Sequence, residues 1–225
     1  MTTWRRIICL ANSYKNGGRC IAGVAFNLMP ALWIRPVSVH DPVGLTEAER
    51  HYADGDEPGL LDIIELPLVG QREHAYQREN WVIDTTTKVQ KSGTVSWEAC
   101  KKYVSKAETL WANTSSTMSG LNDRVPLEQL EGSVQSLHLI HTPNYMIDVT
   151  EPHPESMTKG HRVNARFDYR GVPHSLRVTD PQMVARYQRA PVGEYAVGEA
   201  LLTVSLGEPY HGHAYKLVAG VMERK

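Results

Sequence analysis

The chain has 225 residues, 41% of them hydrophobic, with 24 basic and 25 acidic side chains and a formal net charge of −1. This length suits one larger domain or two small ones, and the charge excludes a protein that is basic overall, though not one with local basic patches. No apolar run approaches the roughly 18 residues of a membrane span, and the 3 cysteines are an odd, sparse set, so the composition predicts a cytoplasmic protein without a signal peptide, disulfides or a membrane partner.

The first 90 residues have the pattern of β-strands. Short apolar runs predict strands at 6–11, 20–26, 32–37, 61–68 and 80–84. Between the first two runs lies Asn16-Gly17, a pair that tolerates positive φ and is typical of a hairpin turn. These strands have the number and size of those in a small closed barrel.

The spacing of apolar residues then changes to that of a helix. Five of them recur at intervals of three and four: Trp97, Cys100, Val104, Ala107 and Trp111. Ser96 is placed to cap the first turn. We therefore expect an amphipathic helix near 96–111, followed by a polar loop at 113–120 that separates two halves of the chain.

The second half returns to the β pattern. Strands are predicted at 137–140, 145–149, 163–169, 176–178, 200–205 and 215–221. Asp180-Pro181 predicts the start of a short helix near 180–190, with Asp as N-cap and Pro at the first helical position. The predicted fold is mostly β with a few short helices. It forms two small β-barrels packed in tandem, with domains at 1–115 and 116–225.

Several segments resemble one prokaryotic family. The sequence RIICLANS at 6–13, GGRCIAG at 17–23 and WIRPV at 33–37 resemble the dual OB-fold-containing domain found near defence and conflict genes. Segments 178–181, 204–209 and 215–219 agree with it, so the resemblance covers nearly the whole chain. It implies two OB-like barrels and binding of nucleic acid or of a nucleotide.

Basic residues gather in one stretch of each predicted barrel. Residues 1–40 hold 5 Arg and Lys and no acid, and residues 155–190 hold 7 against 3 acids. Backbone phosphates need such stretches, and neighbouring aromatic rings could stack on bases. The predicted contacts are Asn12, Ser13, Tyr14, Lys15, Arg19, Trp33, Arg35, Arg166, Tyr169 and Arg177. An ordinary solvated basic face explains the same charges.

The residues around Gly17 and Gly18 allow a narrower hypothesis. Glycines let backbone amides approach an anion, and Lys15 and Arg19 could flank one phosphate. A hairpin turn explains the glycines equally well, because the spacing of a Walker motif is absent.

Metal and catalytic motifs are weak. His138 and His141 are three residues apart in a predicted strand and point to opposite faces, and no zinc-type spacing occurs. No Gly-x-Ser-x-Gly motif surrounds Ser205. We therefore expect no metal, no cofactor and no catalytic residue.

The leading functional hypothesis is a non-catalytic recognition module for single-stranded or structured DNA or RNA, in a prokaryotic defence context. One alternative is a sensor or enzyme that acts on a small nucleotide-like ligand in a cleft between the barrels, lined by Ser205, Glu208 and Lys216. A second is a protein-interaction adaptor, which would expose an apolar patch. The identity of the ligand and the oligomeric state stay open.

Overall fold

The computed structural model describes residues 1–15, 17–40, 44–130, 135–152 and 160–224. The chain divides into two compact units, the first made of residues 1–104 with 133–137 and the second of residues 105–132 with 138–225. The division thus falls after Val104, earlier than the expected boundary near residue 115. None of the described helices is long and apolar enough to cross a membrane.

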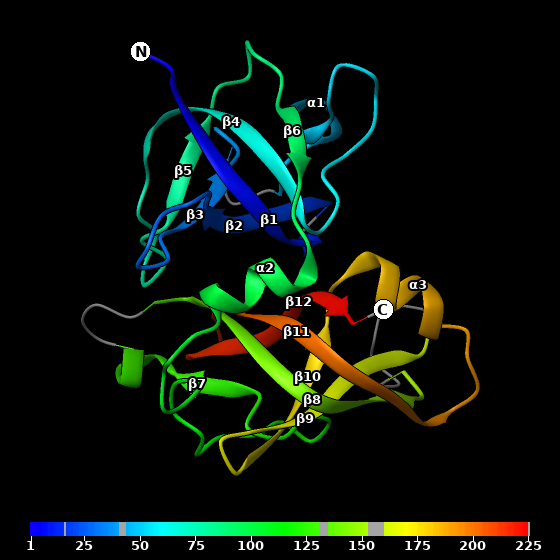
Figure 1. Cartoon of the computed structure of the whole chain (residues 1–225). Helices are drawn as coiled ribbons and strands as arrows, with labels where there is room; N and C mark the ends of the chain where they lie inside the picture. Colours follow the sequence, from blue (N-terminus) through cyan, green and yellow to red (C-terminus); the bar gives the residue numbers. More distant parts are fainter. Residues whose placement is uncertain (16, 41–43, 131–134, 153–159, 225) are drawn as a thin grey trace. The chain divides into compact units, whose positions relative to one another are not determined.

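The first unit is a barrel with a short extra strand (Figure 1). Its elements are β1 (Thr3–Lys15), β2 (Gly18–Ala25), β3 (Trp33–Val37), α1 (Glu47–Arg50), β4 (Asp62–Gln71), β5 (Asn80–Ile83), β6 (Gln90–Thr94), α2 (Trp97–Cys100) and the 3-10 turn η1 (Lys101–Tyr103). The strand order β1-β2-β3-β5-β4 closes through pairing of β1 with β4, and β6 adds to the outer edge of β4. β3 and β5 are parallel.

The second unit repeats this plan. Its elements are β7 (Arg124–Pro126), the 3-10 turn η2 (Leu127–Leu130), β8 (Leu137–Thr150), β9 (Arg162–Tyr169), β10 (Val172–Val178), α3 (Pro181–Tyr187), β11 (Gly193–Tyr210) and β12 (His213–Glu223). The strand order β10-β9-β8-β11-β12 closes through pairing of β10 with β12, and this pair is parallel. β7 adds to the edge of β12.

Both rings therefore have one connectivity. The first strand of each pairs with the second and the fourth, the third runs parallel to the fifth, and a short helix joins the third to the fourth. This is the five-stranded Greek-key barrel of the OB type. The predicted fold class, mostly β with two OB-like barrels in tandem along the chain, is confirmed.

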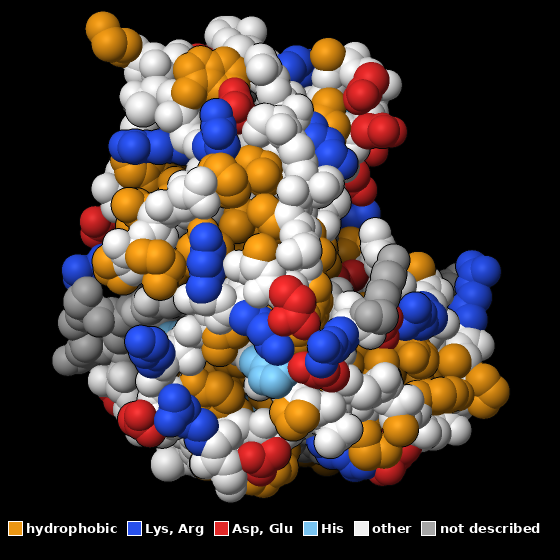
Figure 2. Space-filling view, in the orientation of Figure 1, with side chains coloured by type: hydrophobic (Ala, Val, Ile, Leu, Met, Phe, Trp, Pro, Cys, Tyr) orange, Lys and Arg blue, Asp and Glu red, His pale blue; other side chains and the backbone are white. Residues whose placement is uncertain are grey.

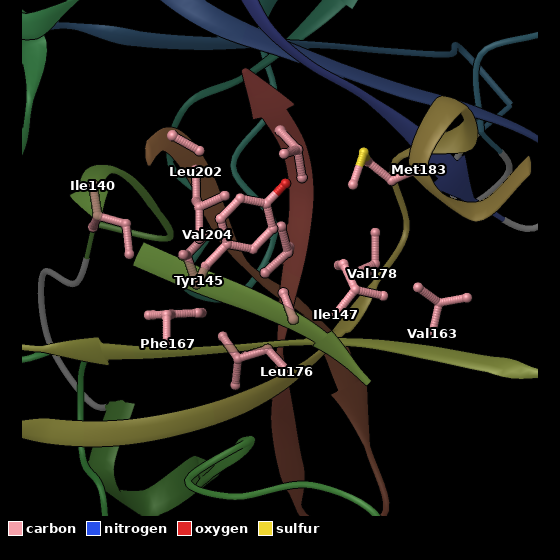
Figure 3. Close-up of a cluster of buried hydrophobic side chains, with 14 of the residues drawn as sticks. Ile140, Tyr145, Ile147, Val163, Phe167, Leu176, Val178, Met183, Leu202 and Val204 are labelled. Atoms are coloured by element: carbon pink, nitrogen blue, oxygen red, sulfur yellow. The ribbon is translucent and has the colours of Figure 1, made fainter. Parts of the chain in front are cut away.

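Each barrel has its own hydrophobic core. In the first, Ile7, Ile34 and Ile64 are at most 1% exposed and belong to one cluster. In the second, Figure 3 shows Tyr145 and Phe167 surrounded by aliphatic side chains. The strands supply these side chains alternately, because successive residues of a strand point to opposite faces.

The predicted β1–β2 hairpin is present. Lys15 pairs with Gly18, and Gly17 has φ +79°; Asn16 lies outside the described residues. Gly18 is required by packing as well, since a Cβ there would come within 2.6 Å of the Leu45 carbonyl oxygen. The structural interpretation of these glycines therefore suffices to explain them.

The predicted helix near 96–111 is much shorter in the structure. Ser96 caps it, because its side chain accepts a hydrogen bond from the Ala99 N–H, but α2 and η1 together end at Tyr103. Val104 has ψ 131° and is extended, and the Ser105 N–H donates to the Leu139 carbonyl at 2.7 Å. The chain leaves the helix because pairing with β8 offers its backbone another partner.

The second short helix agrees with its prediction. The Asp180 carboxylate accepts hydrogen bonds from the Gln182 and Met183 N–H groups at the start of α3. The two strands predicted at 137–140 and 145–149 form one strand, β8, whereas α1, β6 and β7 were not predicted because their sequences are short and polar.

Candidate nucleic-acid interface

A cavity in the first unit lies beside the β1–β2 turn. Its volume is about 640 Å³, and we call it the Arg19 pocket. It is lined by Tyr14, Lys15, Gly17, Gly18, Arg19, Thr46, Glu47, Ala48 and Arg50. Three residues of the predicted phosphate site, Tyr14, Lys15 and Arg19, therefore meet around one hollow.

Arg19 is held in this pocket with part of its hydrogen-bonding capacity unused. Its guanidinium lies over the ring of Tyr14 at 4.4 Å from the centroid, and Nη2 is 3.8 Å from the Glu57 carboxylate. Nη1 is buried and has no hydrogen-bond partner. A buried N–H without a partner costs about 1–3 kcal/mol, and an anion in the pocket relieves that cost only if the guanidinium turns Nη1 toward the hollow, because Nη1 is closed to solvent.

The other charges of the pocket are mostly compensated. Arg50 Nε donates to the Glu57 carboxylate at 2.8 Å, and Arg50 Nη1 donates to the Leu45 carbonyl at 3.3 Å. Although burial raises the pKa of Glu57, the hydrogen bond from Arg50 and the charge of Arg19 bring it below its ordinary value. Glu57 is therefore a carboxylate bound mainly to Arg50, which leaves Arg19 as the cation of this group with an unmet donor.

Asn12 and Ser13 support the hairpin from inside. Asn12 Nδ2 donates to the Pro58 carbonyl at 2.8 Å, and Ser13 Oγ donates to the Cys20 carbonyl at 3.5 Å. Ser13 is 5% exposed. These two side chains do not line the Arg19 pocket, and their contacts are structural.

Trp33 and Arg35, which the sequence placed on the binding surface, are core residues instead. They are 5% and 3% exposed, and every residue of β3 is buried. Arg35 Nη2 lies 2.9 Å from the Glu79 carboxylate and donates to Ser136 Oγ at 3.1 Å. The strand is buried along its whole length, so neither side chain offers an open surface to a base or a phosphate. Trp33 lines a hollow of about 550 Å³ together with Arg78 and Trp81, and Arg35 Nε is buried without a hydrogen-bond partner.

Tyr169 is also a core residue instead of a stacking surface. It is 7% exposed and belongs to the hydrophobic cluster of the second unit. Its hydroxyl donates to the Ala107 carbonyl at 2.5 Å. Its position in the alternating pattern of β9, two residues after Phe167, accounts for this orientation.

Arg166 lies on the outer face of β9, as predicted, but carboxylates neutralise it. Its guanidinium is 2.8 Å from Glu194 and 3.7 Å from Asp148. The hydrogen bond that Arg166 donates to the Glu194 carboxylate holds the pKa of Arg166 above its ordinary value. Arg166 is therefore poorly suited to phosphate binding.

Arg177 has a different environment. Its side chain has no hydrogen bond or ion pair with any residue that the structure describes, and its backbone position pairs with Asn164 across β9 and β10. Arg162, two residues before Asn164 and on the same face, donates from Nε to Asn164 Oδ1 at 3.1 Å. We call Arg162 and Arg177 the arginine pair. Arg162 is not among the predicted contacts because the alternating pattern predicts a strand that begins one residue later, at 163.

The arginine pair is partly desolvated. Burial lowers the pKa of both guanidinium groups, and the charge of Arg162 lowers that of Arg177 further. Asp123 partly compensates Arg162, but its carboxylate already accepts two hydrogen bonds from Thr117. Because the charge of Arg162 disfavours that of Arg177, these two neighbouring guanidinium groups are candidate anion ligands, and planar N–H donors of this kind match phosphate oxygens.

Asn164, which lies between the two members of the arginine pair, is held in place by hydrogen bonds. Its Nδ2 donates to the Ser119 carbonyl at 2.7 Å and to Ser175 Oγ at 3.3 Å. β9 and β10 are the second and third strands of the barrel, and in OB folds the face of these strands binds oligonucleotides. The arginine pair therefore lies on the surface where this fold presents ligands.

The polar residues predicted to share a cleft do not gather. Ser205 pairs with Leu217 and Leu206 pairs with Lys216, so Ser205 and Lys216 point to opposite faces of the sheet. Glu208 lies in the irregular stretch between Leu206 and Pro209. Within the described part of the chain, no three His, Cys, Asp or Glu side chains group as metal ligands.

Lys216 is an interior residue with an unusual partner set. It is 1% exposed, and its Nζ donates to the Ala112 carbonyl at 2.8 Å and to Asn113 Oδ1 at 2.7 Å. Burial lowers the pKa of Lys216 to about 7. Its ammonium group ties the segment before β7 to the barrel, which is a structural role.

On the face shown in Figure 2, Lys and Arg side chains alternate with Asp and Glu and form no broad basic field. On this face, charged groups are therefore best considered as local pairs.

A family profile described as the dual OB-containing domain matches residues 5–221. No curated protein and no solved structure matches the chain.

Proposed function

Since the chain belongs to the dual OB-containing domain family, we propose that it is a non-catalytic module that binds nucleic acid by its phosphate backbone. The observation that carries this proposal is the arginine pair. Its members lie on the second and third strands of an OB barrel, are partly desolvated, and repel each other electrostatically. Such an arrangement gains stability when a phosphate lies between the two charges.

The Arg19 pocket supplies a second phosphate contact in this proposal. The guanidinium of Arg19 is stacked on Tyr14 and keeps one buried N–H without a partner. Lys15 lines the same hollow. The pocket lies at the loop between the first and second strands, which is another part of the OB barrel that contacts oligonucleotides.

Fluorescence anisotropy with labelled oligonucleotides over a series of salt concentrations tests the proposal. Affinity is expected to fall with salt by a slope of about 0.7 per phosphate contact on single strands. Changing both members of the arginine pair to Gln should reduce that slope by roughly one unit or more, whatever the base sequence. Arg170→Gln is the matched control, because Arg170 already pairs with Glu108 at 3.2 Å.

The alternative ligand is a small nucleotide, which the hollow Arg19 pocket favours. If the folded protein binds no oligonucleotide at low salt but binds mononucleotides, and Arg19→Gln removes that binding, this alternative replaces the proposal. A prokaryotic defence context and a cytoplasmic location are proposals that rest on the resemblance and on composition.

A further inference from the structure

We propose that the second unit carries a platform on which unpaired bases stack, and that its ligand is therefore single-stranded nucleic acid. The platform is at the tip of the β11–β12 hairpin. This inference rests on the proposed function, because stacking adds to phosphate binding and does not replace it.

Aromatic rings cluster at this tip. Tyr210 is 62% exposed, and its ring centroid lies 4.1 Å from that of His211, edge-on at 85°. The ring of Tyr215 is 6.2 Å from that of Tyr210. We call these three residues the Tyr210 cluster. Its rings support each other while most of Tyr210 faces solvent.

The turn that presents these rings has a defined conformation. Tyr210 pairs with His213, and the two residues between them, His211 and Gly212, have φ +46° and φ +76°. Positive φ at both central residues is the geometry of a tight two-residue hairpin, whose twist matches that of the flanking strands. The rings are thus held by paired backbone and not by a long loop.

The Tyr210 cluster lies on the same surface as cations. On β12, Leu217 pairs with Arg177, and Tyr215 pairs with Arg124 of β7. Residues two apart in a strand share a face and are roughly 7 Å apart, so Arg177 and Tyr215 follow one another along one side of the barrel. Arg124 is oriented by a hydrogen bond from its Nε to Ser115 Oγ at 2.8 Å.

A single strand fits this order of groups better than a duplex does. Its bases are free to leave the strand and stack on a protein ring, and such stacking does not depend on sequence because every base has a π-face. In a duplex the bases stack on each other and hide their faces. The hairpin between the fourth and fifth strands is also a part of the OB barrel that contacts oligonucleotides.

The test uses the full chain and anisotropy with three labelled probes: a 20-residue oligo-dT, a DNA duplex of equal charge, and an abasic strand of equal length. Tyr210→Ala is expected to weaken oligo-dT binding roughly 5- to 150-fold and to leave the salt slope, the duplex affinity and the abasic-strand affinity unchanged. Tyr210→Phe keeps the ring and should bind as the wild type does.

The outcomes separate this inference from the proposed function. If the wild type binds none of the probes at low salt, the proposed function fails. If it binds and Tyr210→Ala binds oligo-dT equally well, only the stacking platform is overturned. Tyr210 is exposed, so its substitution should leave folding intact, and a thermal melt checks this for both variants.

Discussion

Replacing Arg177 with Gln is expected to stabilise the free protein and, at the same time, to weaken its binding of anions. In the free protein the arginine pair is an electrostatic cost, since burial and the neighbouring charge both lower the pKa of Arg177. Gln keeps a polar side chain of moderate length at this position. The substitution therefore removes one charge of the pair without emptying the site.

The magnitude follows from the strand register. Arg177 pairs with Asn164, and Arg162 lies two residues away, a diagonal position about 7–8 Å across two strands. Two unit charges about 8 Å apart repel by about 0.5 kcal/mol in water and about 2 kcal/mol at an effective dielectric constant of 20. The charge of Asp123 offsets part of this repulsion, because it favours the charged form of Arg162. A gain of about 0.5–2 kcal/mol raises Tm by roughly 1–8 °C.

Thermal denaturation with and without inorganic phosphate, at ionic strength matched with chloride, measures both effects. The wild type should gain Tm as phosphate is added, because a ligand of the native state stabilises it, and Arg177→Gln should gain less. Arg170→Gln serves as the paired-charge control. A lower Tm for Arg177→Gln in the absence of phosphate, or equal gains for both proteins, would refute the reasoning.

Three further predictions concern buried groups. Trp33→Ala and Arg35→Ala are each expected to lose about 3–5 kcal/mol of unfolding free energy, the first by leaving a cavity and the second by leaving a buried carboxylate unpaired. Burial lowers the pKa of His138 and of His174 from 6.5 to about 4, so the unfolded chain binds protons in that window that the native chain does not. Stability is therefore full above pH 6.5 and falls by up to about 3 kcal/mol for each as the pH drops toward 4. Lys216, with its pKa lowered from 10.5 to about 7, should make stability rise from pH 7 to 10.5, and Lys216→Met should flatten that rise.

Urea titrations of the wild type and the variants across this pH range check all three predictions. If Trp33→Ala leaves the unfolding free energy unchanged, the conclusion that Trp33 is a core residue is wrong. Equal unfolding free energies at pH 6.5 and pH 4 would contradict the lowered pKa values of His138 and His174. A rise above pH 7 that persists in Lys216→Met would assign it to another group.

The sequence was sufficient for most strands of the two barrels because local patterns determine them, whereas the short polar strands β6 and β7 were not predicted. Alternation along β9, the hairpin pair at Gly17 and the Asp180-Pro181 cap each act within a few residues, and all agree with the structure. The helix near 96–111 was overextended because its apolar spacing continues past Tyr103. What ends it is a backbone bond to Leu139, a partner distant in sequence.

The candidate site was harder to predict for the same physical reason. Alternation indicates which side of a strand a residue occupies, but not whether another segment covers that side. Arg35 is buried because Ser136, 101 residues later, contacts it. Arg166 and Arg177 look alike in sequence, and only the contacts with Glu194 and Asp148 show that Arg166 is neutralised. The Tyr210 cluster was not predicted, because the approach of Tyr215 to Tyr210 depends on pairing across the hairpin.

The central claim is that nucleic acid binds on the face formed by β9, β10 and the β11–β12 hairpin. Amide chemical shifts of the ¹⁵N-labelled full chain, titrated with single-stranded oligo-dT, test it most directly. The largest changes are predicted at Arg162, Arg177 and residues 210–215, with a second set at residues 14–19. Changes confined to other surfaces of the second unit, or no changes at saturating oligonucleotide, would contradict the claim.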